Sequence, residues 1–318
     1  MSPLDRLCTW AAGPKWTRGR LPVTGPSPYV RRRWLGHEIR RLRAEHRLSG
    51  EQLARALGFP RQQISALENG RLGPDIDLVS GICEYLQVGP RRRDAIIAAA
   101  TDGWATGWWI KDADRIGDRQ ARFADLESGT AAITEYALAL VPGLLQTADF
   151  ADARVRSDPS RQSDTFDPVA AVAARSHRQH LVVAAGGPTY DVVLDEFAVR
   201  RCAAEASVVA AQLRHITALC AAHHSITVQI LPIGAAIKGH SAPCSAYSIY
   251  RYRDAQATVA VAVDTLTTDL ILTEPAEVDA YRHLHSRLKA AALSPEASIH
   301  LLTTVAYQMG QQPEGAAA

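Results

Sequence analysis

The chain has 318 residues, a length that predicts about two domains of ordinary size. Hydrophobic residues make up 47% of it, which excludes a wholly disordered, collagen-like or coiled-coil protein. No apolar run reaches the roughly 18 residues of a membrane span, so no membrane partner is expected. The five cysteines are scattered, and none has C-x-x-C spacing. Together with the absence of a good secretory signal, this favours a cytoplasmic protein with reduced thiols.

Charge is unevenly divided along the chain. Residues 1–95 hold 17 Lys and Arg against 9 Asp and Glu, whereas residues 96–318 hold 18 against 24. The formal net charge of +2 therefore hides a basic first part and an acidic remainder. A basic part favours a polyanionic partner such as nucleic acid, and the acidic remainder indicates a different role.

Residues 1–33 are predicted to form a flexible basic arm. Pro and Gly are frequent there, no apolar period is sustained, and the segment ends in the run Arg31, Arg32, Arg33. Beside a DNA-binding module, such an arm could follow phosphates or reach into a groove. The alternatives are a solvated tail and a wrongly assigned start codon.

Residues 34–100 are predicted to form a compact set of five short helices. Leu35, Ile39 and Leu42 recur at helical spacing in the first of them. A capping box at Ser49 and Gln52 marks the start of the second helix, and Gly58 marks its end. The third helix is expected to start near Pro60 or Arg61 and the fourth near Asp75, and the fifth is expected over residues 92–100.

The segment 48–71, LSGEQLARALGFPRQQISALENGR, carries the main functional signal. Ile64 and Leu67 turn its second helix toward the core, which leaves polar and small side chains near the helix start facing outward. In the major groove Gln pairs bidentately with adenine and Arg with guanine, and the Ala66 methyl can touch a thymine methyl. The predicted DNA-binding residues are Arg61, Gln62, Gln63, Ser65, Ala66, Asn69, Arg71 and Gln52.

This segment resembles the Cro/phage-repressor (XRE-type) helix-turn-helix family over about residues 35–90. The stretches that carry the resemblance are Leu53-Ala54, Leu57-Gly58, Ile64-Ser65 and Leu67-Glu68-Asn69-Gly70. The resemblance implies double-stranded DNA as the partner and phosphate contacts at Asn69 and Arg71. Two departures are Gly50, where the family usually has Gln, and Pro60 at the start of the recognition helix. A helical bundle that binds protein is the alternative.

A homodimer is expected, because one short recognition helix reads only a few base pairs and a two-fold pair doubles the site.

Residues 101–128 are predicted to be an aromatic-rich connector, and residues 129–308 an α+β domain with a mixed sheet. We expect strands within residues 131–140, 190–194 and 226–231, a hairpin over 247–252 and 258–263, and helices over 143–156, 169–185, 205–223 and, as the final one, 274–293. Residues 309–318 are predicted to be a disordered tail. The expected fold class is therefore multidomain, an all-α helix-turn-helix domain followed by the α+β domain.

The second half resembles the uncharacterised C-terminal domain that follows the helix-turn-helix in antitoxin-like regulators of filamentous, antibiotic-producing bacteria. The supporting stretches are Gly107-Trp108-Trp109, Leu126-Glu127, residues 141–147, Arg178-Gln179, Leu194-Asp195-Glu196, residues 228–232 and residues 293–296. Departures are Phe150, where Tyr is commoner, and Asp264, where Glu is. The resemblance implies a half that senses or docks something, and a small partner protein encoded nearby is a common association.

Several residues of this half are candidates for a ligand site. The tryptophans could stack on a flat ligand or pack in the core, and Arg175 and Arg178 share one helix face. Acidic residues that adjoin apolar runs could line a pocket, although Asp195-Glu196 could equally cap a helix. The predicted ligand-binding residues are Trp108, Trp109, Glu127, Tyr136, Gln146, Arg175, Arg178 and Glu196.

Catalytic and metal-binding patterns are missing from the sequence. It has no H-E-x-x-H, no G-x-S-x-G and no glycine-rich phosphate loop, and His283 and His285 fall on different helix faces. We therefore expect no enzymatic activity, no metal and no cofactor. The predicted function is a cytoplasmic, sequence-specific transcription regulator whose second half senses a small ligand or mediates dimerisation. The alternatives are an antitoxin-like scaffold for a small partner protein and an enzyme with a DNA-targeting head.

Overall fold

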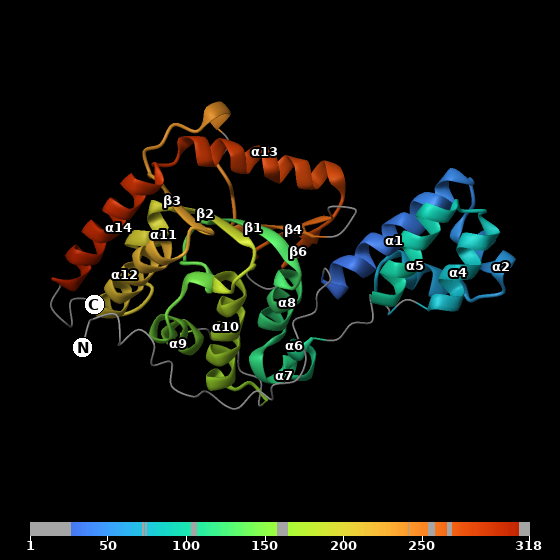
Figure 1. The fold of residues 1–318 in the computed structure, drawn as a ribbon, viewed down its shortest axis with the longest axis horizontal. Coiled ribbons are helices and arrows are strands. Elements are labelled where there is room, and N and C mark those ends of the chain that lie inside the picture. The colour runs from blue at the N-terminus through green and yellow to red at the C-terminus, as the bar shows by residue number, and fades with distance from the viewer. Residues whose placement is uncertain are drawn as a thin grey trace.

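The computed structural model describes residues 27–71, 73, 75–102, 107–157, 165–240, 242–253, 258–265 and 269–311. Figure 1 shows a small group of helices beside a larger unit built on a six-stranded sheet. This arrangement confirms the expected fold class of a helical domain followed by an α+β domain. We call residues 34–102 the head and residues 107–311 the C-terminal unit.

The head contains the five helices expected from the sequence. They are α1 (Pro28–Glu45), α2 (Gly50–Leu57), α3 (Arg61–Glu68), α4 (Ile76–Tyr85) and α5 (Pro90–Asp102). Their inward side chains form one apolar cluster, which includes Leu35, Ile39, Leu53, Ile64 and Val79. A separate core of this kind allows a small helical domain to hold its shape without support from a sheet.

Local signals explain where α2 begins and ends. The Ser49 hydroxyl accepts a hydrogen bond from the amide of Gln52, and the Gln52 side chain accepts one from the amide of Ser49 at 2.7 Å. Gly58 ends the helix with φ of 70°, a left-handed conformation that costs glycine nothing. The capping box and the stop predicted from the sequence are both confirmed.

Close packing joins α1 to α3. A Cβ on Gly36 would lie only 2.6 Å from the carbonyl oxygens of Leu67 and Glu68, so the two helices can cross here only with glycine in α1. Arg43 of α1 also donates two hydrogen bonds to the Glu68 carboxylate, at 2.6 and 3.0 Å. The carboxyl end of α3 is therefore held firmly against α1.

The predicted basic arm ends earlier than expected. Pro28 is the first residue of α1, and the Ser27 hydroxyl caps it by accepting from the amide of Val30, so Arg31, Arg32 and Arg33 are helical. Ser followed by Pro is a normal helix start, because Pro has no amide hydrogen to satisfy at that position. Residues 1–26 of the predicted arm lie outside the described residues.

The predicted connector over residues 101–128 is also corrected. Residues 107–128 form three short helices, α6 (Trp108–Lys111), α7 (Ala113–Ile116) and α8 (Asp118–Glu127), which pack into the C-terminal unit. The apolar side of α8 consists partly of alanines, Ala121 and Ala124, which give a weak periodic signal in sequence. Trp104 lies outside the described residues.

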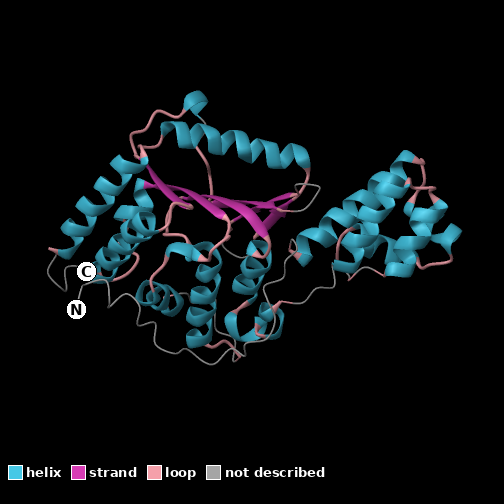
Figure 2. Cartoon of the chain, viewed as in Figure 1, coloured by secondary structure: helices cyan, strands magenta, loops and turns pink. Residues whose placement is uncertain are grey.

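The sheet is mixed, with strand order β3-β2-β1-β4-β5-β6 (Figure 2). Its strands are β1 (Thr130–Ala137), β2 (Thr189–Asp195), β3 (Ile226–Leu231), β4 (Tyr247–Tyr252), β5 (Val259–Val263) and β6 (Leu270–Leu272). The first three run parallel, whereas β4 pairs antiparallel with both β1 and β5. The predicted hairpin is thus confirmed, and β1 is the strand at which the sheet changes from parallel to antiparallel pairing.

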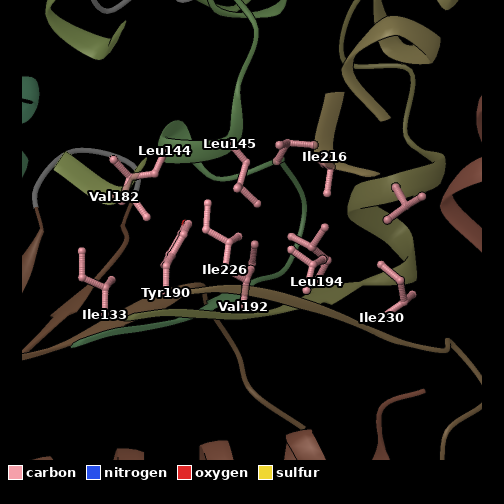
Figure 3. Packing of buried hydrophobic residues seen from close by; sticks show 14 of the residues in the cluster. Ile133, Leu144, Leu145, Val182, Tyr190, Val192, Leu194, Ile216, Ile226 and Ile230 are labelled. Carbon is pink, nitrogen blue, oxygen red and sulfur yellow. The ribbon is translucent and has the colours of Figure 1, made fainter. Parts of the chain in front are cut away.

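Helices cover both faces of the sheet (Figure 1). The helix α13 (Pro275–Ala291) lies on one face, over an apolar cluster that includes Tyr136, Val193 and Tyr247. The opposite face carries α8, α9 (Ala148–Arg156), α10 (Pro168–Val183), α12 (Ala206–Ala222) and α14 (Pro295–Gly310). Figure 3 shows Leu144, Leu145, Val182 and Ile216 packed over the strand residues of this larger core.

Three further predictions for this unit are corrected. Residues 143–156 are two helical segments, a 3-10 turn (Gly143–Leu145) and α9, because Thr147 caps α9 by accepting from the amide of Phe150. The helix over 275–291 is not final, since α14 follows after the Ser294 cap. Met309 is buried, so the tail does not begin there. The short elements α11 (Glu196–Arg200) and β6 were not anticipated.

Candidate functional site

The start of α3 is exposed, as the sequence predicts. Arg61, Gln62 and Ser65 lie at the surface, while Ile64 and Leu67 are buried in the core of the head. Arg71 is exposed just beyond the helix. Among the residues that the structure describes, neither Arg61 nor Arg71 forms an ion pair. Both guanidinium groups are therefore available to an anionic or base-edge partner.

The other predicted DNA-binding residues are less accessible or take part in hydrogen bonds within the head. Gln63 and Ala66 are half-buried, and Gln52 is exposed with its side-chain oxygen engaged in the capping box. The side-chain nitrogen of Asn69 donates to the Ser65 carbonyl at 2.6 Å, and its side-chain oxygen accepts from Arg40 at 3.0 Å. The second bond ties the end of α3 to α1. The phosphate contact implied for Asn69 stays a prediction.

Several other arginines of the head are engaged in ion pairs within or between helices. Arg92 of α5 contacts Glu38 and Glu45 of α1, at 2.5 and 2.9 Å, and Arg41 contacts Glu38 at 2.9 Å. Burial raises the pKa of Glu38, but the hydrogen bonds from Arg41 and Arg92 outweigh it and hold the pKa below its usual range. Positive charge in the head is therefore only partly available for DNA.

A second candidate site is a cavity of about 480 Å³ in the C-terminal unit. It lies over the carboxyl ends of β1 and β5, with α8 and α10 as walls and the loop after β1 at its mouth. The polar lining consists of Arg119, Gln120, Glu127, Glu135, Gln146, Arg175, Arg178, Ser248, Tyr250 and Asp264. The volume falls within the range of small-molecule sites, and a change of strand pairing is a favoured place for them.

Four of the eight predicted ligand-binding residues line this cavity: Glu127, Gln146, Arg175 and Arg178. Arg178 donates to both oxygens of the Glu127 carboxylate, at 2.8 and 2.5 Å, and also donates to Gln120. Burial disfavours the charge on Arg178, but the Glu127 carboxylate more than compensates and raises the Arg178 pKa. A buried ion pair of this kind gives a preformed, charged cavity wall.

Hydrogen bonds from α10 also shape the mouth of the cavity. Arg175 donates to the Gln146 side-chain oxygen, and the Gln146 amide donates to the Val141 carbonyl at 2.7 Å. Gln179 donates to the carbonyls of Gly143 at 3.1 Å and Gln146 at 2.5 Å. The loop after β1 is therefore held in one conformation against the helix.

The cavity includes acidic residues that were not among the predicted site residues. Glu135 accepts a hydrogen bond from Tyr190 at 2.5 Å, and burial raises the Glu135 pKa to about 8. Glu135 is one of the residues that line the cavity. Burial also raises the pKa of Asp264, to about 6, although Arg119 lies 3.5 Å away. A single acid on the inward side of an apolar strand is the signal that could have identified Glu135.

The other four predicted ligand residues do not line the cavity. Trp108 and Trp109 pack on α8 and α10, with the Trp108 ring 4.7 Å from the His177 ring. Tyr136 lies on the opposite face of the sheet, because side chains alternate along β1, and its hydroxyl donates to Asp195 at 3.0 Å. Glu196 pairs with Arg200 at 2.6 Å. These four residues therefore do not belong to the cavity, and a ligand-binding role for them stays a prediction.

Within the described ranges, no group of three or more His, Cys, Asp or Glu side chains is arranged to hold a metal ion. Within the same ranges, every helix is too short or too polar to cross a bilayer.

Comparison with known families agrees with both halves of the fold. A family described as a helix-turn-helix domain matches residues 34–96, and a domain of unknown function, DUF5753, matches residues 120–304. Comparisons with curated proteins and with solved structures gave no match. The first match confirms the resemblance to XRE-type DNA-binding domains, and the second spans more than half of the chain. The chain therefore belongs to the DUF5753 family and carries that domain behind a helix-turn-helix DNA-binding domain.

Proposed function

We propose that this protein is a sequence-specific transcription regulator whose C-terminal unit binds a small polar effector. The observation that carries the DNA part is the exposed start of α3 on a helix-turn-helix domain. The observation that carries the effector part is the preformed charged cavity beside β1. No catalytic step forms part of this proposal.

The chemistry of α3 fits base recognition. Gln62 can pair bidentately with adenine and Arg61 with guanine, while Arg71 is placed to contact a phosphate. A helix of eight residues reaches few base pairs, so the proposal includes a homodimer on a two-fold site.

The cavity fits a small polar molecule better than an apolar one. Its wall combines the Arg178–Glu127 ion pair with Arg175 and with Glu135, whose raised pKa makes it a hydrogen-bond donor at neutral pH. Buried charges that line an open space are costly for stability alone, which supports a role in binding.

Selection of DNA from a random pool by the full chain tests the DNA part. We expect one preferred sequence, and Gln62→Ala should weaken binding to it by about 1–3 kcal/mol and relax the choice at one base pair. Gln308→Ala, an exposed glutamine on α14, is the matched control and should leave selection unchanged. Equal weakening of all sequences by Gln62→Ala would contradict base recognition.

Native mass spectrometry and thermal shift of the full chain test the effector part, with amino acids, nucleosides and small carboxylic acids as probes. A bound molecule should stabilise the wild type, and Arg175→Gln should lose that effect, whereas the exposed Arg214→Gln should keep it. A stoichiometric small protein that co-purifies, with no probe bound, would instead favour the scaffold alternative.

A further inference from the structure

The helix α1 belongs to both parts of the molecule. Its first turn is buried in the C-terminal unit, where Val30 is 0% exposed within the same apolar cluster as Leu126 of α8. Its later residues, including Leu35 and Ile39, form the core of the head. Figure 1 shows the helix leaving the C-terminal unit near α8 and running without interruption into the head.

One acidic residue of α8 anchors the start of α1. The Asp125 carboxylate accepts hydrogen bonds from the Ser27 hydroxyl and, at 3.3 Å, from the Tyr29 amide. Negative charge at a helix amino end stabilises the helix, because the first amides there lack partners. Burial raises the Asp125 pKa, while hydrogen bonds from Ser27, Tyr29 and Trp109 and the charge on Arg32 act to lower it. The contact between the two elements is thus polar, buried and specific.

The same helix forms a wall of the cavity. Gln120, Phe123 and Glu127 lie three and four residues apart on one side of α8 and line the cavity. Arg178 binds Gln120 and Glu127 together, and its guanidinium lies 5.3 Å from the Phe123 ring centre. Asp125 is two residues from Glu127 and therefore points away from this side, toward α1.

Just after its first turn, α1 contacts the end of the recognition helix α3. Gly70, at the end of the α3 turn, lies against the backbone of Arg32, where an added Cβ would come within 3.1 Å. The Arg33 guanidinium donates to the Asn69 carbonyl at 3.3 Å. A rotation or shift of α1 would consequently move α3, which is held by its carboxyl end, and with it the exposed start of that helix.

We propose that α8 couples the cavity to DNA binding through the Asp125 contact with α1. A ligand that rearranges the Gln120–Arg178–Glu127 contacts shifts α8, changes the hold of Asp125 on α1, and so alters the placement of α3. The inference rests on the proposed function, because it requires specific DNA binding by the head. Asp125 is a positioning residue in this scheme and touches neither DNA nor ligand.

A double-mutant cycle on the full chain tests the coupling without a known ligand. Phe123→Ala disturbs the cavity wall, Asp125→Asn weakens the contact with α1, and the readout is the dissociation constant for the DNA selected by the wild type. We expect Phe123→Ala to change that constant by at least about fivefold when Asp125 is present and by less than about twofold in the Asp125→Asn background. Hydrogen exchange of residues 28–33 should accelerate in both single variants.

Two further variants keep the test decisive. Asp118→Asn removes the same charge from an exposed position of α8, and the effect of Phe123→Ala should survive in that background. Should Asp125→Asn fail to fold, Ser27→Ala removes the hydroxyl donor from the α1 side and should abolish the Phe123 effect in the same way.

The possible failures are distinguishable. A wild-type chain that selects no DNA sequence would refute the proposed function. A wild type that selects DNA but whose affinity ignores Phe123→Ala, or a Phe123 effect that persists with Asp125→Asn and Ser27→Ala, would overturn the coupling alone.

Discussion

The head and the C-terminal unit handle charge in opposite ways. In the head, ion pairs such as Arg92–Glu45 lie near the surface between helices, and Arg61 and Arg71, which form no ion pair within the described residues, lie at the two ends of α3. In the C-terminal unit, charged groups such as Arg178, Glu127 and Glu135 are enclosed around a cavity. The head thus presents charge outward to a large polyanion, whereas the C-terminal unit keeps it inside, where water competes little.

This contrast separates two kinds of recognition. Exposed charge gives long-range, salt-sensitive attraction, which suits a polymer of phosphates. Enclosed charge gives short-range selectivity, because a ligand must replace the hydrogen bonds that the lining residues form with one another.

The largest effect is expected at the buried ion pair. Arg178→Met leaves the Glu127 carboxylate without its partner and should lower the free energy of unfolding of the C-terminal unit by about 3–5 kcal/mol. Urea unfolding followed by hydrogen exchange of α8 and α10 measures it. The double variant with Glu127→Gln should recover a large part of the loss. A change below about 1 kcal/mol for Arg178→Met would show that the pair is not enclosed.

The next effect concerns pH. The Glu135 pKa rises from 4.5 to about 8 on folding, so the folded state favours the neutral acid. Its stabilisation is full below pH 4.5 and is lost as pH rises toward 8, which predicts a C-terminal unit that weakens by several kcal/mol over that interval. Glu135→Gln should flatten this part of the pH profile of unfolding, and the exposed Glu205→Gln should not. Identical profiles for wild type and Glu135→Gln would contradict the prediction.

A smaller effect tests the packing of the head. Gly36→Ala forces a methyl group against the carbonyls of Leu67 and Glu68, and should cost about 1–3 kcal/mol and weaken DNA binding. Gly50→Ala meets no atom within 4 Å and should be neutral or stabilising by up to about 1 kcal/mol. Thermal unfolding measures both changes. If Gly50→Ala were the more harmful of the two, the α1–α3 crossing would be wrong.

The smallest effect should appear in the salt dependence of DNA binding. Arg71→Ala removes one proposed phosphate contact, so the slope of log affinity against log salt should fall by about 1 for every DNA sequence. Titrations at three salt concentrations measure it. Arg282→Ala, an exposed arginine of α13, serves as control and should leave the slope unchanged. Sequence-dependent losses for Arg71→Ala would place this residue on a base instead.

Prediction from sequence was most successful in the head. The capping box at Ser49 and the glycine at position 58 are short-range signals, and they remain valid because each acts within one helical turn. The strands β1 to β5 of the C-terminal unit also followed from their patterns, whereas β6, α8 and α14 did not. An alanine-rich surface such as that of α8 shows little amphipathic contrast, so its packing depends on neighbours far along the chain.

The cavity shows where sequence patterns become insufficient. Glu127, Gln146, Arg175 and Arg178 were identified as candidates, but so were Trp108 and Tyr136, which the fold places elsewhere. Side chains alternate along β1, so Glu135 faces the cavity and its neighbour Tyr136 faces α13. Sequence shows this alternation but does not show which face holds the cavity.

The amino-acid sequence alone determined that this protein has a basic helix-turn-helix followed by a mixed α+β half, because helix caps, turn residues and apolar periods act locally. Tertiary structure decided which polar groups meet around the cavity and that α1 is shared by both halves. The pairing of Ser27 with Asp125 spans 98 positions, and only the packed chain brings two such distant residues together.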